Sequence, residues 1–404
     1  MLEMALDPRQ LEGRRKKVVV VLLMLATALT ILSTDLYIPT LPHLPAVFNT
    51  TAEWVQLSLG LNIAALGMTQ LLIGPLSDRF GRRRLFIMGV AGFVATSIGC
   101  ALANNIYEFL FWRVLQGGCA AVEAVLVYAI LTDIFDEKSR VKILSVYGMI
   151  IAIVPAAAPL FGGYLYHWLG WQACFYFIAI CAALIFLGMW RTLPETTAKD
   201  LHAMRPMRLL KDYWQLLTTP AFMVYTIILA LAMGFFFSYL TSGPFIFIDY
   251  FGVKTEHFGW YSGIMILSFS AGSWFAGRLA KKLTTPNVLL VGLIGAASGC
   301  LLLAAPIFFG VHHLGALTTA LCMAAFFLGP IFASAPSMAM EHAPGNAGIA
   351  SATIGSMQML GASTASFMVT IFHDGSPRPL AITLAGIIVL GIFCALYGKR
   401  VKAL

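Results

Sequence analysis

Three ionisable side chains stand inside long apolar runs of this chain: Asp35, Arg113 and Glu123. Charged groups are costly in hydrocarbon, so such residues usually belong to ion or proton pathways. Asp35 lies about 17 residues into the run 18–41, and Arg113 about seven residues from one end of the run 107–131, so the two lie at similar depths at a rise of about 1.5 Å per residue. Burial favours a protonated carboxylate and a nearby arginine favours a charged one, which suits reversible proton binding. A static buried ion pair is the alternative.

Glu123 follows Arg113 by ten residues, about 80° farther round the helix and nearer its predicted cytoplasmic end. Gln116, Gly117 and Ala120 lie on or near the same face. Small and polar residues on one arc of a membrane helix are typical of a face that lines water or substrate, which makes Gln116 a candidate substrate contact. Glu123 is either a second proton carrier or a structural partner at the mouth of the pathway, and the sequence favours neither.

The composition around these residues is that of an integral membrane protein. Hydrophobic residues fill 59% of the 404 positions, charged residues only 11%, and the mean hydropathy is +0.85. Apolar runs of about 20 residues recur, each long enough to cross about 30 Å of hydrocarbon as a helix, and the short alternating segments of a β-barrel are absent. The sequence predicts an all-α fold of twelve transmembrane helices, at 18–41, 54–76, 85–104, 107–131, 142–166, 172–192, 221–248, 258–281, 287–309, 314–339, 348–372 and 379–398.

The distribution of basic residues predicts the orientation of these spans. With the N-terminus inside, 23 of the 26 Lys and Arg fall on the inner side, two fall outside, and Arg113 lies within a span. Because inner loops carry the excess of Lys and Arg, both termini are predicted to be cytoplasmic. The net charge of +8 then reflects topology and attraction to anionic lipid, and no nucleic-acid partner is expected.

Two six-helix halves, 18–192 and 220–398, are predicted on either side of a polar cytoplasmic linker at 193–219. The basic N-terminal tail 1–17 leads into an apolar run without a small-residue cleavage site, which favours an uncleaved first helix over a signal peptide. The linker either is amphipathic and lies on the membrane surface or is a solvated charge run. A second cytoplasmic tail covers 399–404.

A basic block separates the second and third runs, and it reads Gly74-Pro-Leu-Ser-Asp78-Arg79-Phe-Gly81-Arg82-Arg83-Arg84. Its five charges are predicted to form a short cytoplasmic loop. Part of the block recurs 199 residues later as Gly277-Arg278-x-x-Lys281-Lys282. The block resembles the loop between helices 2 and 3 of the major facilitator superfamily, G-x-L-[AS]-D-R-x-G-R-[RK]. The repeat agrees with the two halves of that fold, which hold a substrate site between them.

Two further motifs resemble those of the same superfamily. Arg113-x-x-Gln116-Gly117 matches its fourth-helix motif R-x-x-Q-G-x-x-x-A, whose arginine is linked to proton transfer. The stretch Pro155-Ala-Ala-Ala-Pro159-Leu-Phe-Gly162-Gly163 resembles the G-P-x-x-G-G motif of antiporters, although Ala158 replaces the first glycine. Such prolines and glycines kink a helix and admit a close neighbour, and an ordinary kinked helix is the alternative.

The end of the first run, Thr34-Asp35-Leu-Tyr37-Ile-Pro39-Thr-Leu-Pro42, resembles the bicyclomycin and chloramphenicol resistance (Bcr/CflA) branch of twelve-helix drug:proton antiporters. The exit Leu193-Pro194-Glu195-Thr196 after the sixth run agrees with this branch. The resemblance covers the whole chain. It implies alternating access between the two halves, driven by a proton gradient.

The resemblance also implies gating roles for the basic block, in which Gly74 opens the motif. Asp78 is expected to face the positive end of a second-half helix and to latch the cytoplasmic side. Arg79 and Arg82 are expected to pair with Asp133, and Gly81 permits the tight turn.

A drug pocket is expected to be apolar, aromatic and adaptable. Phe236 and Tyr239 in the seventh run and Phe326 in the tenth are candidate substrate contacts, and Tyr37 is better placed because it lies beside the acidic residue of the first run. Aromatic residues in a span more often pack or face lipid.

The sequence carries no signature of an enzyme: it lacks a G-x-x-x-x-G-K-[ST] motif for ATP, H-E-x-x-H and G-x-S-x-G. The adjacent His312 and His313 are poorly spaced for a metal, and the seven cysteines are expected to be buried thiols, so no metal or cofactor is predicted. The expected partners are a small-molecule substrate, protons and the lipid bilayer, for a monomer in the bacterial inner membrane. A dedicated exporter of one metabolite, a symporter for uptake and a transporter-like receptor are the alternatives, and the fifth-run motif and the lack of a soluble signalling domain disfavour the last two.

Overall fold

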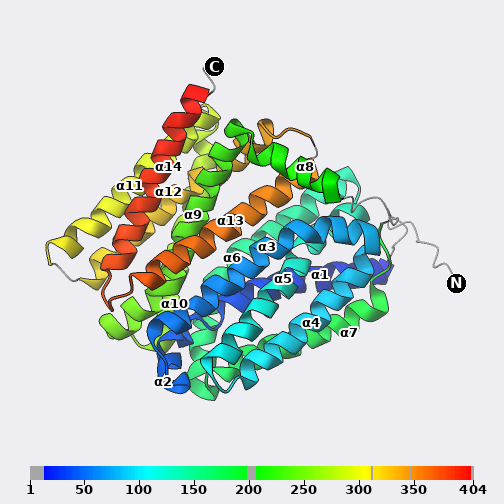
Figure 1. Cartoon of the computed structure of the whole chain (residues 1–404), viewed down its shortest axis with the longest axis horizontal. Helices are drawn as coiled ribbons and strands as arrows, with labels where there is room; N and C mark the ends of the chain where they lie inside the picture. Colours follow the sequence, from blue (N-terminus) through cyan, green and yellow to red (C-terminus); the bar gives the residue numbers. More distant parts are fainter. Residues whose placement is uncertain (1–12, 198–205, 311–312, 346, 402–404) are drawn as a thin grey trace.

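A computed structural model describes residues 13–197, 206–310, 313–345 and 347–401 of the chain. Twelve long helices dominate the described residues (Figure 1). The helices of the first half are α1 (Gly13–Asp35), α3 (Ala52–Phe80), α4 (Arg82–Leu102), α5 (Ile106–Ile134), α6 (Glu137–Leu169) and α7 (Gln172–Thr192). Those of the second half are α9 (Pro220–Pro244), α10 (Thr255–Leu279), α11 (Thr285–Phe308), α12 (Leu314–Glu341), α13 (Ala347–Ile371) and α14 (Arg378–Val401). Shorter elements are the 3₁₀ helix η2 (Ile38–His43), α2 (Leu44–Phe48), α8 (Pro206–Leu217) and the π-helical η3 (Phe245–Tyr250).

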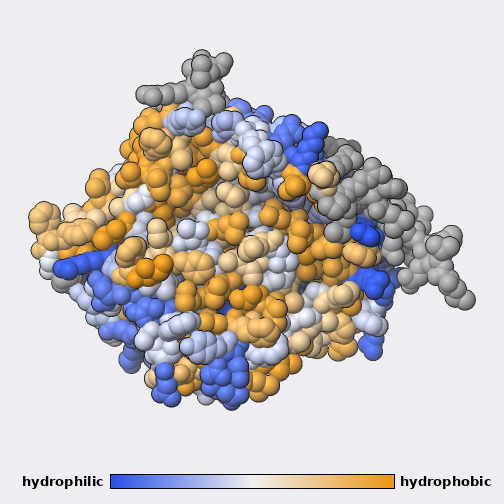
Figure 2. Space-filling model, in the orientation of Figure 1, coloured by the Kyte–Doolittle hydropathy of each residue, from blue (hydrophilic) through white to orange (hydrophobic). Residues whose placement is uncertain are grey.

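The predicted all-α membrane fold of twelve helices in two halves is confirmed. Hydrophobic side chains cover much of the face shown in Figure 2, and hydrophilic ones gather mainly at its lower and right-hand margins. We call the end of the bundle that carries Gly81 and α8 the linker end, and the end that carries α2 and η3 the far end. Residues 1–12, Lys199, Arg205, His312 and 402–404 lie outside the described residues.

Within the described part of the chain, ten of the twelve long helices are apolar enough to cross a membrane by composition alone, and α10 and α13 are not. Both are rich in glycine and serine. The structure gives the reason, because these two helices pack across the boundary between the halves, α13 on α3 and α10 on α6. Small residues let helix backbones approach closely in a membrane, at the expense of overall hydropathy.

Two boundaries differ from the prediction. The first helix ends at Asp35 instead of continuing to residue 41, since Pro39 and Pro42 take the chain into η2. The predicted loop from Gly74 to Arg84 is almost wholly helical: α3 continues to Phe80, and α4 begins at Arg82. Gly81 alone turns the chain, at a φ of 94° that side chains rarely adopt.

Glycines on α6 and α10 allow close backbone contacts toward the far end, both within the first half and between the halves. A Cβ at Gly162 would collide with the carbonyl oxygen of Leu36, and one at Gly163 would lie 2.8 Å from the carbonyl oxygen of Thr255. A Cβ at Gly259 of α10 would collide with the backbone of Leu160. At these positions only glycine fits without displacing a neighbouring backbone.

The α3–α13 contact is held by two hydrogen bonds of the same kind. The Ser356 hydroxyl donates to the carbonyl oxygen of Gly67 over 2.7 Å, and Ser363 donates to that of Gly60 over 2.9 Å. The two serines are seven residues apart on α13, and the two glycines are seven residues apart on α3, which is about two helical turns in each case. The two halves therefore meet along a regular seam of serine hydroxyls and glycine carbonyls.

Candidate substrate and proton site

Arg113 lies in the core of the first half, and its side chain is fully buried. One guanidinium nitrogen donates to the carbonyl oxygen of Ser33 over 3.0 Å and to Oε1 of Gln116. The other terminal nitrogen donates to the hydroxyl of Tyr37 over 3.3 Å. The guanidinium carbon also lies 4.5 Å from the centre of the Tyr37 ring and 5.9 Å from that of Phe175. Neutral oxygens and aromatic faces therefore surround this charge.

Neighbouring amides and hydroxyls hold this arrangement in place. The Gln116 side chain donates to the Ser97 hydroxyl of α4 over 2.8 Å, which directs its oxygen toward Arg113. Asn62 of α3 donates to the backbone carbonyl of Arg113 over 2.8 Å. Sequence reasoning missed Asn62 and Ser97, although an asparagine within an apolar run was a signal that could have identified one of them.

Asp35 is the last residue of α1 and is buried. Its Oδ1 accepts a hydrogen bond from the Thr34 hydroxyl over 2.9 Å. Among the described residues, ion pairs join Arg82 to Asp78 and to Asp133, and neither Asp35 nor Arg113 takes part in one. Asp35 and Arg113 were expected to lie close together, and this is found only in part. Arg113 binds residues on both sides of Asp35 but not its carboxylate.

Glu123 is buried where α5 faces α1, and its Oε2 accepts from the Thr30 hydroxyl over 3.0 Å. Its Oε1 has no hydrogen-bond partner in the described structure. Thr30 and Thr34 are one turn apart on α1, so the two acids bind successive hydroxyls of one helix. The structure thus groups Glu123 with Asp35 along α1.

The second half repeats part of this site without its charges. The Tyr239 hydroxyl lies 3.1 Å from Ser262 Oγ, as the Tyr37 hydroxyl lies 3.1 Å from Ser58 Oγ. Both tyrosines are almost completely buried. Around Tyr239 lies a narrow pocket, without room for a water molecule, that is lined by Phe247, Tyr261, Met265, Thr318, Leu321 and Cys322.

The other aromatic candidates lie apart from this pocket. Phe236 is half-buried in a cluster with Phe269 and Phe332, with ring centres 5.1 and 6.1 Å away. Phe326 packs instead against Phe275 and Phe327. Phe236 and Phe326 are therefore not brought together with Tyr239 in one pocket in this conformation.

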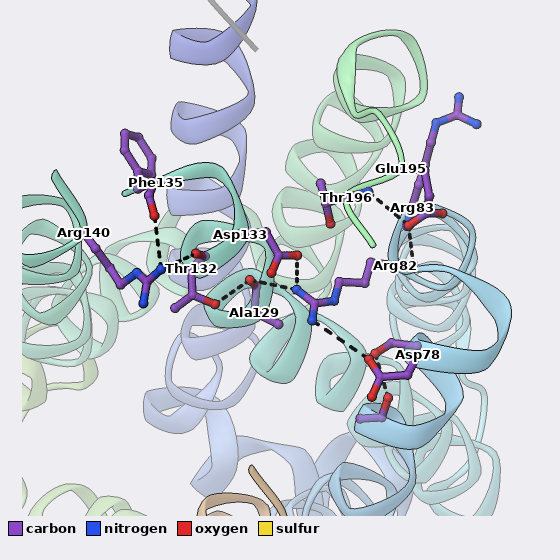
Figure 3. A network of polar contacts seen from close by, with 12 residues as sticks. Asp78, Arg82, Arg83, Ala129, Thr132, Asp133, Phe135, Arg140, Glu195 and Thr196 are labelled. Atoms are coloured by element: carbon purple, nitrogen blue, oxygen red, sulfur yellow. Dashed lines mark hydrogen bonds and ion pairs between the residues drawn. The ribbon is translucent and has the colours of Figure 1, made fainter. Parts of the chain in front are cut away.

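A polar network braces the linker end of the first half (Figure 3). The Arg82 guanidinium contacts the Asp133 carboxylate, donates to the carbonyl oxygen of Ala129 over 3.0 Å and lies 3.9 Å from Asp78. Arg79 is exposed, with its guanidinium 5.3 Å from the Phe80 ring centre. Of the two arginines expected to pair with Asp133, the structure brings only Arg82 to it.

Glu195, in the segment that follows α7, also belongs to this network (Figure 3). Its Oε1 accepts from the backbone nitrogen of Arg82 over 2.8 Å, at the first turn of α4. A carboxylate at a helix N-terminus satisfies free N–H groups and the helix dipole. Arg83 closes the contact by donating from Nε to the carbonyl oxygen of Leu193 over 2.7 Å. The sequence singled out this segment only as a resemblance and assigned Glu195 no role.

The proline and glycine motif marks a change in how α6 packs. From Lys142 to Ala157 none of the described side chains is buried, whereas Ala158 and Pro159 are. Pro155 and Pro159 thus lie where a loosely packed part of the helix meets the part that packs closely, at Gly162 against Leu36 and at Gly163 against the second half. A proline removes a backbone hydrogen bond of the helix, so this is a point where α6 can bend.

Two histidines join the halves at the far end. His43 Nε2 lies 2.8 Å from the Thr255 hydroxyl, and His373 Nδ1 lies 3.2 Å from Nε2 of Gln56. Each half contributes one histidine. Burial lowers the pKa of His373 from its usual value, while the nearby Glu53 carboxylate acts in the opposite direction.

Metal or thiol chemistry finds no support among the described residues. No group of three or more His, Cys, Asp or Glu side chains there is placed to hold a metal ion. The seven cysteines are free, and Cys100, Cys174 and Cys300 are buried.

Comparison with known proteins gives a consistent result. The profile of the Major Facilitator Superfamily matches residues 23–366. A chloramphenicol resistance protein of Pseudomonas aeruginosa is 30% identical over 382 residues, covering 92% of this chain and 88% of that protein. The multidrug transporter MdfA of Yersinia pestis is 26% identical over 406 residues, covering 100% and 99%.

Solved structures match the fold at low sequence identity. A bacterial homologue of the human lysosomal transporter Spinster, in an inward-facing and unoccupied conformation, has a TM-score of 0.74 at 13% identity, with 96% of this chain and 97% of that chain covered. The xylose transporter XylE of E. coli, partially occluded and inward open, has a TM-score of 0.71 at 15% identity, with coverage of 95% and 98%.

Proposed function

The chain belongs to the major facilitator superfamily, and from that premise we propose that it exports drugs or other amphipathic compounds in exchange for protons. Membership makes the protein a multi-pass membrane transporter of a small-molecule substrate rather than an enzyme. The relatives named for chloramphenicol resistance, bicyclomycin resistance and multidrug transport support the substrate class.

The observation that carries the coupling proposal is the isolation of the buried charges in the first half. Asp35 and Glu123 each accept one threonine hydrogen bond and have no basic partner among the described residues. A buried carboxylate without a counter-charge is far more stable with a proton than without one. Admission of water or of a cationic substrate would reverse this preference, which is the property that a proton-coupled site needs.

We propose that Arg113 controls the site from beside α1. Its bonds to Ser33 and Tyr37 hold the end of α1 on both sides of Asp35. When Asp35 loses its proton, this guanidinium, which binds the residues on both sides of Asp35, can exchange a neutral partner for the carboxylate. Protonation would thereby change how α1 is held against α5.

Alternating access would couple this change to substrate movement. Substrate enters from the cytoplasm or the inner leaflet, competes with protons near Asp35 and Arg113, and leaves when the halves rock. Pro155 and Pro159 supply a bending point in α6, and the network of Asp78, Arg82 and Asp133 braces the linker end. On the predicted topology the linker end is cytoplasmic, in the inner membrane of a bacterium, and the working unit is a monomer.

Transport in proteoliposomes tests the proposal. Purified protein is reconstituted, a pH gradient is imposed, and the movement of ethidium or chloramphenicol is followed for wild type and Asp35→Asn. We expect movement against the proton flux that the substitution abolishes. No movement of such compounds by folded protein would instead favour export of a single metabolite. Gradient-driven transport that survives in Asp35→Asn would refute the assignment of Asp35.

A further inference from the structure

Two buried carboxyl groups lie along one face of α1, and a threonine binds each of them. The Thr30 hydroxyl donates to Oε2 of Glu123 over 3.0 Å. The Thr34 hydroxyl donates to Oδ1 of Asp35 over 2.9 Å. Thr30 and Thr34 are four residues apart, so they share a face of the helix and lie about 6 Å apart along its axis. Because α1 begins next to the end of α7 at the linker end, Glu123 is the acid nearer that end.

The threonine hydroxyls can serve both the protonated and the charged form of these acids. Thr30 Oγ1 also lies 3.1 Å from the carbonyl oxygen of Ala26, and Thr34 Oγ1 lies 2.8 Å from that of Ile31. A hydroxyl has one hydrogen to donate and two lone pairs that accept. It can therefore donate to an ionised carboxylate, or donate to the backbone carbonyl and accept from a protonated acid. Because both acids have this arrangement, both are placed to exchange a proton.

Arg113 is the positive charge beside the two acids, and it limits how much charge the site can hold. Its guanidinium binds Ser33 and Tyr37, and no ion pair joins it to either acid among the described residues. The phenol of Tyr37 and the thiol of Cys119, which interacts with Glu123, are neutral near pH 7. With both acids protonated the site thus carries one positive charge, and burial makes further positive charge costly. Each positive charge of a bound cation must therefore displace one proton.

Glu123 has one carboxyl oxygen without a hydrogen-bond partner among the described residues. The side chain is buried, and its Oε1 is unpaired while its Oε2 is bound to Thr30. A buried carboxyl oxygen without a partner costs stability, so an acid that served only to join α1 to α5 would be expected to bond through both oxygens. The unpaired oxygen points to a further group that Glu123 binds during transport.

We propose that Asp35 and Glu123 together form a site for dicationic substrates, in which each dication displaces two protons. The inference rests on the proposed export in exchange for protons and specifies the charge of the substrate. In the state open to the cytoplasm, the dication lies along α1 with one cationic centre at each carboxylate, and both protons leave to the cytoplasm. In the state open to the outside, two protons bind again and the dication leaves. Two positive charges move in each direction, so the exchange is electroneutral. A monocation displaces one proton, and the other acid stays protonated.

The number of protons exchanged per substrate tests this inference directly. Methyl viologen is a dication, and N-methyl-4-phenylpyridinium is a monocation of the same two-ring shape. Wild-type protein in proteoliposomes exchanges each labelled probe against protons, which an internal pH indicator counts. We expect two protons per methyl viologen and one per N-methyl-4-phenylpyridinium, because each buried positive charge displaces one proton. One proton for both probes, or transport of the monocation alone, would overturn the inference but leave the proposed export standing. Transport of neither probe by folded protein would contradict the proposed export as well.

Glu123→Gln tests the residue itself, because glutamine keeps an acceptor for Thr30 but cannot exchange a proton. We expect the ratio of methyl viologen transport to monocation transport to fall about ten-fold or more in this variant. Glu108→Gln, the same substitution at an exposed position of α5, is the control and should keep the wild-type ratio. A purely structural role of Glu123 would lower the transport of both probes equally, so an unchanged ratio in Glu123→Gln would overturn the proposal.

Discussion

The two halves share a fold but differ in what they bury. Asp35, Arg113 and Glu123 are all buried in the first half, together with the amides of Gln56, Asn62 and Gln116. In the second half, the buried polar side chains of the described residues are serine and threonine hydroxyls and the phenol groups of tyrosines. Both halves hold a buried tyrosine hydroxyl against a serine hydroxyl, so they differ in their buried charges and amides rather than in how their helices are arranged.

This contrast suggests a division of labour. A charge buried in hydrocarbon is costly, which makes it a candidate for a functional role. We propose that the first half carries the groups that respond to protons, and that the aromatic residues of the second half contribute apolar contacts to varied substrates. Substitutions at matched positions of the two halves can test this contrast.

The largest effect is expected at Arg113. Arg113→Met removes the charge but keeps an unbranched apolar side chain, and it leaves Ser33, Gln116 and Tyr37 without their donor. Each buried polar group left unpaired costs about 1–3 kcal/mol. We expect loss of pH-driven transport and a clearly lower melting temperature.

The matched control for this change is Leu321→Met, beside Tyr239 in the second-half pocket. A volume-conserving apolar swap costs less than about 1.5 kcal/mol. The pH-driven transport of substrate in proteoliposomes should be nearly normal in this variant. Equal losses in both variants would contradict the division between the halves.

A second effect is expected where α6 packs against the residue that follows α1, next to its contact with the second half. Gly162→Ala would force a Cβ into the carbonyl oxygen of Leu36, and overpacking of this kind costs about 1–3 kcal/mol. In the loosely packed part of the same helix, a Cβ at Gly148 meets nothing within 4 Å. Thermal unfolding should show a lower melting temperature for Gly162→Ala and no decrease for Gly148→Ala. A similar melting temperature in both variants would argue against the close contact.

A smaller and more specific effect is expected at the two tyrosines. Tyr37→Phe and Tyr239→Phe remove the same hydroxyl bond to serine, worth about 1 kcal/mol. Only Tyr37 also accepts from Arg113. We expect similar losses of stability, but a shifted pH dependence of transport in Tyr37→Phe alone. A shifted profile in Tyr239→Phe would assign coupling to both halves.

The smallest effect is expected at His373 on the far end. Burial lowers the pKa of this imidazole. The amide nitrogen of Gln56 can only donate, so Nδ1 of His373 must accept, which requires the neutral ring. The contact is thus strongest at a pH above the ordinary histidine pKa of about 6.5, and it weakens as the pH falls below that value. His373→Gln keeps an amide partner that does not titrate. The melting temperature of wild type relative to this variant should fall between pH 8 and pH 5, and a constant difference would contradict this account.

The sequence predicted the number of helices and the halves because apolar length and charge position are local properties of the chain. It placed the end of α1 too late, since the run of apolar residues conceals the effect of Pro39 and Pro42 on the helix. It also read the block from Gly74 to Arg84 as a loop, because charge predicts the membrane surface and not the local backbone conformation.

The site was harder to predict than the fold. Asp35, Arg113 and Glu123 stand out individually because they are charged among apolar residues. Their partners, such as Thr30, Asn62 and Ser97, depend on which faces of α1, α3, α4 and α5 meet, and a single sequence does not specify that. The binding of Glu195 to the start of α4 is another contact between distant segments that no local pattern reveals.

Proton release on substrate binding tests the central claim most directly. Substrate is added to weakly buffered, purified protein, and the pH change is recorded for wild type, Asp35→Asn, Glu123→Gln and the exposed second-half control Asp249→Asn. We expect wild type and Asp249→Asn to release protons and Asp35→Asn to release none, with a reduced release from Glu123→Gln if both acids carry protons. Undiminished release from Asp35→Asn and Glu123→Gln would contradict the claim that the first half carries the coupling.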